Sequence, residues 1–169
     1  ISPSIPNNEG SLAPLEVVAP EGCILNAPYP LAVAARHLVG HFLPQVVFGA
    51  LCKAVPSKVM ADSGLFSALY FCGRDPKGLN YAMEYDPNGG LGATAHGDGY
   101  PSTAFPLQSP VISTEVWEAS TGLRVETRAI KPDTGGPGKY RGGQGQVVVI
   151  RNVTGEPVRV SITISRTEY

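Results

Sequence analysis

Two histidines four residues apart are the first candidates for chemistry in this sequence. His37 and His41 fall in a long apolar stretch whose three- and four-residue spacing predicts a helix. Because residues four apart share one face of a helix, both imidazoles could bind the same metal ion. The zincin motif would place Glu directly after the first histidine, where this sequence has Leu38. His96 and Asp98 could supply a third ligand only through folding, so we expect two structural histidines and no bound metal.

The second candidate is a glycine-rich stretch, residues 133–146, which reads Asp-Thr-Gly-Gly-Pro-Gly-Lys-Tyr-Arg-Gly-Gly-Gln-Gly-Gln. A Walker A loop is excluded because Tyr140 follows Gly138-Lys139 where Ser or Thr is required. A dinucleotide fingerprint is excluded because Arg141 replaces the third glycine and a strand pattern follows. Lys139 and Arg141 beside exposed glycine amides could still receive an anion. The alternative is a structural loop in which Tyr140 plugs onto the sheet.

We expect this loop to be ordered and to pack against the sheet or a subunit partner. Ordering each residue costs about 1–2 kcal/mol of backbone entropy, so Tyr140 must be buried and the loop amides bonded. Several glycines are predicted at positive φ, so that Gly136→Val and Gly143→Val should both destabilise the fold. The residues expected to build the loop are Asp133, Gly135, Gly136, Gly138, Tyr140, Gly142 and Gly143.

Composition restricts the possible partners and the compartment. The net charge is −1 without runs of like charge, which gives no footprint for nucleic acid or an anionic membrane. Arg36 and Lys53 interrupt the longest apolar stretch, so it is not expected to span a membrane. Three widely spaced cysteines without a Cys-x-x-Cys motif indicate reduced thiols and a cytoplasmic location. No Gly-x-Ser-x-Gly motif is present, and the sequence assigns no catalytic residue.

The apolar stretch, residues 31–55, must position the histidines. Its broad apolar arc predicts one long, largely buried helix. Pro44 lacks an amide hydrogen and would clash with the carbonyl of Gly40, so we expect a kink there. Residues 1–14 are rich in Pro, Asn and Ser and predict an extended arm or linker. Residues 15–169 are then expected to form a single domain.

Strand patterns dominate the rest of the chain. Residues 65–72 and 79–85 are expected to form a hairpin, since the second run alternates apolar and polar residues. Two further strands are predicted over residues 114–119 and 123–130. A second hairpin is predicted from residues 147–153 and 158–164. The fold class is therefore α+β, with a mostly antiparallel sheet, one dominant Pro-kinked helix and long Gly/Pro-rich loops.

Several stretches together carry a family resemblance. Residues 132–145, Pro-Asp-Thr-Gly-Gly-Pro-Gly-Lys-Tyr-Arg-Gly-Gly-Gln-Gly, resemble the signature of the hydantoinase B/oxoprolinase family. Asn8-Glu9-Gly10, residues 19–26, residues 32–37 and residues 49–56 resemble further motifs in the family's order. That family includes the B subunits of N-methylhydantoinases, the C-terminal half of oxoprolinases and a large subunit of acetone and acetophenone carboxylases.

The resemblance implies a piece of an ATP-dependent enzyme that hydrolyses a cyclic amide together with an A-type, ATP-using subunit. Carboxylation of a ketone and a non-catalytic assembly role are the alternatives. The complex would need ATP and a divalent metal, neither bound by this chain, whose isolated form is expected to be inactive. Expected partners are the A-type subunit, the remainder of its own subunit and further copies. Arg36 matches a family position, and the candidates for binding substrate or an anion are Arg36, Asp98, Lys139 and Arg141.

Overall fold

The computed structural model describes residues 6, 8–34, 36–64, 67–103, 105–106 and 112–164. The chain divides into two compact units, Ile1–Gly40 and His41–Tyr169. This division lies at Gly40, whereas the sequence predicted an arm ending at residue 14 and one domain after it. Residues 1–5 and 7 of the predicted arm lie outside the described residues.

The first unit contains two short helices, α1 (Glu9–Leu12) and α2 (Arg36–Gly40). α1 forms because the Asn8 side chain accepts a hydrogen bond from the Ser11 amide, with the Ser11 hydroxyl completing a capping box. A helix therefore occupies part of the predicted extended arm. The described residues between 15 and 34 form turns and irregular backbone.

The second unit begins with α3 (Leu43–Leu51) and a 3₁₀ turn, η1 (Pro56–Lys58). The prediction of one long, buried helix over residues 31–55 is therefore wrong. α2 ends at Gly40 and Pro44 lies in the first turn of α3, where its missing amide hydrogen has no intrahelical partner to lose. Pro44 thus starts a helix instead of kinking one, and no residue of α3 is fully buried. No helix in the described ranges is long and apolar enough to cross a membrane.

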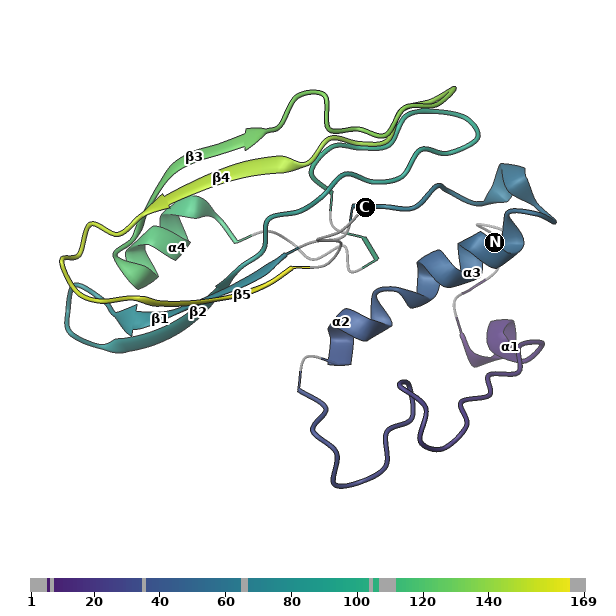
Figure 1. The fold of residues 1–169 in the computed structure, drawn as a ribbon, viewed down its shortest axis with the longest axis horizontal. Helices are drawn as coiled ribbons and strands as arrows, with labels where there is room; N and C mark the ends of the chain where they lie inside the picture. The colour runs from purple at the N-terminus through teal and green to yellow at the C-terminus, as the bar shows by residue number, and fades with distance from the viewer. Residues whose placement is uncertain are drawn as a thin grey trace. The chain divides into compact units, whose positions relative to one another are not determined.

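Two antiparallel sheets make up most of the second unit (Figure 1). The three-stranded sheet has the order β2-β1-β5, formed by β1 (Ala68–Arg74), β2 (Asn80–Tyr85) and β5 (Arg159–Thr163). The two-stranded sheet pairs β3 (Arg124–Ile130) with β4 (Gln146–Arg151). The chain is α+β, and the predicted β1–β2 hairpin and the strand at β3 are confirmed. The first residues of the predicted strand 65–72, residues 65 and 66, lie outside the described residues.

The second predicted hairpin is wrong, because β4 and β5 belong to different sheets. In β5, Val160 and Ile162 are the register partners of Phe71 and Leu69, whereas β4 pairs with β3. The connection after β4 is a tight turn in which the Asn152 side-chain amide donates to the carbonyl of Glu156. That turn carries the chain from one sheet to the other instead of folding it back.

Residues 114–119 were predicted as a strand but form α4 (Thr114–Thr121). The Ser113 hydroxyl accepts from the Val116 amide at the first turn, and Gly122 ends the helix in the left-handed conformation. These caps outweigh the strand preference of Val116 and Trp117. Local capping, not side-chain alternation, decides this segment.

The core of the second unit lies between the two sheets and is anchored by α4 (Figure 1). Trp117 is fully buried and its ring meets those of Phe71 and Tyr85 edge-on, with centroids 5.2 and 5.1 Å away. Leu123 completes the buried cluster, and side chains of β3 and β4 pack on it from the other sheet. Because four large side chains converge here, this cluster fixes the positions of both sheets.

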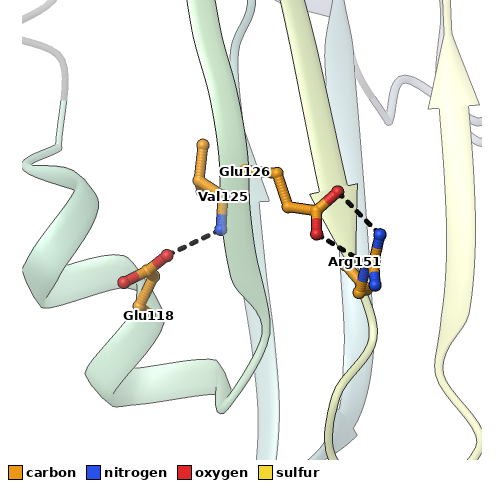
Figure 2. A network of polar contacts seen from close by, with 4 residues as sticks. All are labelled: Glu118, Val125, Glu126 and Arg151. Atoms are coloured by element: carbon orange, nitrogen blue, oxygen red, sulfur yellow. Dashed lines mark hydrogen bonds and ion pairs between the residues drawn. The ribbon is translucent and has the colours of Figure 1, made fainter.

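A polar contact ties α4 to β3 at the point where the β3–β4 ladder is irregular (Figure 2). The Glu118 carboxylate accepts a hydrogen bond of 2.6 Å from the Val125 amide. On the next residue, Glu126 forms a two-pronged ion pair with Arg151 of β4. The bulge at Glu126 therefore loses no backbone partner at Val125, because a side chain replaces the missing ladder bond.

Candidate functional site

A bundle of four extended segments is the candidate site, and residues 90–93 run through its middle. The Gly64 and Ala61 amides donate to the carbonyls of Gly90 and Ala93, at 2.8 and 2.7 Å. Leu91 donates to the carbonyl of Tyr100. We call residues 61–64, 90–93, 99–102 and 141–145 the glycine bundle. Figure 1 shows the two long loops running side by side beyond the ends of β3 and β4.

The glycine-rich loop joins this bundle by its C-terminal arm. The Gly143 amide donates to the carbonyl of Leu91 at 2.8 Å. The Gly99 amide donates to the carbonyl of Arg141, and the Ser102 amide to that of Gln144, both at 2.8 Å. The loop therefore packs against the long loop that follows β2, and not against a sheet as predicted.

Close contact between backbones explains the glycines at the centre of the bundle. A Cβ on Gly90 would overlap the carbonyl of Gly143, and a Cβ on Gly143 would overlap the carbonyl of Tyr100. Both positions admit only glycine unless the segments move apart. At Gly136, by contrast, an added Cβ would meet no atom within 4 Å, so a side chain fits there.

The prediction of positive φ for the loop glycines is wrong. Among the described residues, the glycines at positive φ are Gly22, Gly78, Gly122 and Gly155, none of them in residues 133–146. Asp133 has the left-handed backbone instead, with φ of 57°. The loop uses glycine to let backbones approach, while an aspartate makes the turn that enters it.

Two side chains hold the loop at its neck and near its tip. The Thr134 hydroxyl donates to the carbonyl of Lys131 at 2.8 Å and accepts from the Gly145 amide at 3.0 Å, which closes the neck. Asp98 accepts a hydrogen bond of 2.8 Å from the Arg141 amide, across 43 residues of sequence. The C-terminal arm of the loop is thus held by hydrogen bonds from its neck to its tip.

The structure brings together three of the four residues considered for anion binding. Asp98 is bonded to the backbone of Arg141, and the Lys139 ammonium lies 5.4 Å from the centre of the Tyr140 ring. Tyr140 is half-buried, and the cation beside its ring is stabilised by the ring's negative face. An acidic side chain beside Arg141 reduces the positive potential there, so anion binding at this tip stays a prediction.

A cleft of about 540 Å³ opens beside the bundle. Its walls come from three segments, residues 61–64, 89–93 and 134–145, and are mostly glycine and alanine backbone. Such walls offer amide N–H and carbonyl groups that can bind a neutral polar group. Ser63 on the wall is 1% exposed, and its hydroxyl accepts from the Gln45 amide at 3.1 Å. The cleft can bind and orient a ligand, but this hydroxyl is engaged and buried, which makes it a poor nucleophile.

The histidines do not share a helix as predicted. His37 lies in α2, whereas His41 follows its end and is buried at 5% exposure. They belong to different compact units, as does Arg36 relative to the glycine bundle. In the described part of the chain, no group of three or more His, Cys, Asp or Glu side chains could hold a metal ion.

Sequence reasoning missed a pair of carboxyl groups at the end of β2. Burial raises the pKa of Asp86 to about 6, and the neighbouring negative charge of Glu84 and a hydrogen bond to it add to the rise. A hydrogen bond to Glu84 also raises the pKa of Tyr70, its cross-strand partner in β1. The register of the predicted hairpin could have placed Tyr70 opposite Glu84, but the burial of Asp86 depends on the tertiary fold.

Comparison with known proteins decides the family. The family model described as Hydantoinase B/oxoprolinase matches residues 1–169. The chain belongs to this family. It is 29% identical over 149 residues to a protein of Pseudomonas sp. (strain NS671) that is named as the B-type subunit of a D-/L-hydantoinase. It is also 29% identical over 174 residues to the 5-oxoprolinase PfmaA of Pestalotiopsis fici.

This hydantoinase B/oxoprolinase chain is shorter than its relatives. The matches cover 85% and 98% of the chain but only 24% of the Pseudomonas protein and 13% of PfmaA. Among solved structures, a nucleotide-free acetone carboxylase is similar, with 27% identity and a TM-score of 0.51 over 63% of this chain and 16% of that chain. The chain is therefore a segment when measured against each of these relatives.

Proposed function

We propose that this chain is part of the B-type subunit of an enzyme that hydrolyses a cyclic amide with the help of an A-type, ATP-using subunit. The observation that carries this proposal is a family match along the whole chain, together with two relatives named for hydantoin and 5-oxoproline. Both names refer to a five-membered ring containing an amide, whose C–N bond is broken by addition of water. The substrate class is therefore a small cyclic amide.

The glycine-lined cleft supports a binding role for this chain. A cyclic amide is neutral and carries one donor and one acceptor edge, which exposed backbone amide and carbonyl groups can match. The described residues supply no group of metal ligands, so they do not fit the divalent metal that the family implies. We derive no metal-dependent step from them. In this proposal the chain orients the substrate, and the remaining parts of the complex activate it.

A ketone carboxylase is the second candidate, favoured by the likeness to acetone carboxylase. The two candidates differ in their co-substrate, since ring hydrolysis consumes water and carboxylation consumes bicarbonate. The complete subunit should be purified with its A-type partner and supplied with ATP and either hydantoin, 5-oxoproline, or acetone with labelled bicarbonate. Ring opening without incorporation of label supports hydrolysis, and label in an acid-stable product supports carboxylation.

The 169-residue chain by itself should release no phosphate from ATP. Its sequence has no stretch that fulfils the Walker A or dinucleotide pattern, which are the loops that cradle phosphates. Phosphate release in proportion to the amount of purified chain would contradict this division of labour. A cytoplasmic location and assembly of several copies belong to the same proposal, and size-exclusion chromatography of the complete complex tests the second.

A further inference from the structure

α3 has two apolar faces, and only one of them has a partner in the described residues. On the inner face, Gln45 donates to the Ser63 hydroxyl at 3.1 Å. Phe48 on the same face stacks on Phe105, with ring centroids 6.1 Å apart and planes inclined by 27°. These two contacts fix α3 to its own unit and determine which face points away.

The outer face of α3 is an exposed apolar arc. Its four large side chains recur at three- and four-residue spacing, so they share one side of the helix. Their exposed fractions are 43% for Leu43, 66% for Val46, 51% for Val47 and 42% for Leu51. None of the nine residues of α3 is charged. A helix that is apolar all round is normally buried on all sides, so this arc is a surface that should be covered.

We infer that the outer face of α3 packs against the remainder of a family-length subunit, on an apolar surface without charges. This inference rests on the proposed function. The chain covers 24% and 25% of two relatives, which leaves about three quarters of such a subunit to supply the partner surface. The chemistry of the arc specifies the partner, because branched aliphatic side chains offer no hydrogen bonds and exclude charged neighbours.

The small size of the face favours a partner in the same polypeptide over a second copy. Nine helical residues extend about 14 Å, and four side chains form a patch far below the roughly 1,200–2,000 Å² that stable free-standing interfaces bury. Two separate molecules must also lose translational and rotational freedom on binding. Segments of one folded chain avoid that loss, so a patch of this size is sufficient for packing within one subunit.

The test compares thiol labelling of Val46→Cys and Val116→Cys in the complete subunit and in the 169-residue chain. Val116 is a matched control, because it is also a valine on a helix, α4, and is 55% exposed. The three native cysteines are distinguished from the new thiol by peptide mass. We expect the thiol at position 46 to react about tenfold more slowly, or less, in the complete subunit than in the chain, with little change at position 116.

Three outcomes would overturn the inference. Equal labelling at position 46 in the two proteins would mean that the remainder of the subunit leaves this face open. Slow labelling in the 169-residue chain at all concentrations would assign the cover to residues 1–40. Slow labelling that appears only at high chain concentration would assign it to a second copy. Ring-opening activity is measured separately, so its absence alongside protection at position 46 would reject the proposed function and keep the surface.

Discussion

The two longest helices in the described residues, α3 and α4, have similar lengths and opposite surfaces. α4 buries Trp117 and Thr121 completely and carries Glu115 and Glu118. It also has a side-chain cap at its start, whereas α3 has none. α3 buries no residue completely and has no charge. α4 is thus an amphipathic surface helix whose core lies within this chain, whereas α3 is built for a core that the described residues do not complete.

Removing the α4 anchor should have the largest effect on stability. Trp117→Ala would empty the centre of the aromatic cluster, so we expect a loss of about 3–5 kcal/mol in the free energy of unfolding. Phe48→Ala on α3 removes a half-buried ring with one aromatic neighbour and should cost clearly less in the same chain. Urea denaturation of both variants measures the difference. Equal losses would mean that α3 is as well packed as α4 and would remove the contrast between them.

The glycine bundle gives the next largest effect, and it is specific to position. Gly143→Val should cost about 1–3 kcal/mol or more, because its side chain would collide with the Tyr100 carbonyl. Gly136→Val should change stability by no more than about 0.5 kcal/mol, since that position is open and its φ lies outside the left-handed region. The sequence predicted that both would destabilise. Thermal melts of the two variants beside the parent test this correction, and equal melting temperatures for both variants would refute it.

The outcome for the glycine loop illustrates what sequence could and could not supply. The Gly-rich composition of residues 133–146 indicated a built loop, because ordering it needs compensating contacts. Sequence could not distinguish a glycine needed for positive φ from one needed for close approach. That distinction depends on Tyr100 and Leu91, which are far away in the chain. The Asp98 contact to Arg141 spans 43 residues for the same reason.

The same limit explains the errors in secondary structure. Alternation identified β1, β2 and β3, which pair in the two sheets around the core. It failed for α4, where the caps Ser113 and Gly122 carry the signal instead. It also failed to pair β5, since an alternating strand does not reveal which of two sheets it joins. For α3, the apolar pattern predicted burial that the described residues alone do not provide.

A pH effect should follow from the buried side of the comparison. The pKa of Asp86 is raised to about 6 in the folded protein, above its ordinary value of 3.8. The folded state therefore binds more protons than the unfolded state between these values, and stability falls as pH rises from about 4 through 6. Asp86→Asn should remove this fall and melt higher than the parent at pH 7. Parallel melting curves for parent and variant across pH 4–7 would contradict the raised pKa.

The smallest effect should come from the ion pair between Glu126 and Arg151 (Figure 2). The Arg151 and Glu126 side chains are 64% and 31% exposed, so water and salt screen their attraction. Glu126→Gln should therefore cost about 0.2–1 kcal/mol at low salt and almost nothing at high salt. Glu118→Gln is the informative control, because it weakens the charge-assisted acceptor of the Val125 amide that joins α4 to β3. We expect its cost to exceed that of Glu126→Gln and to persist in salt. If the two losses were equal and both vanished in salt, the contact from Glu118 would be an ordinary surface interaction, and α4 would depend on its aromatic anchor alone.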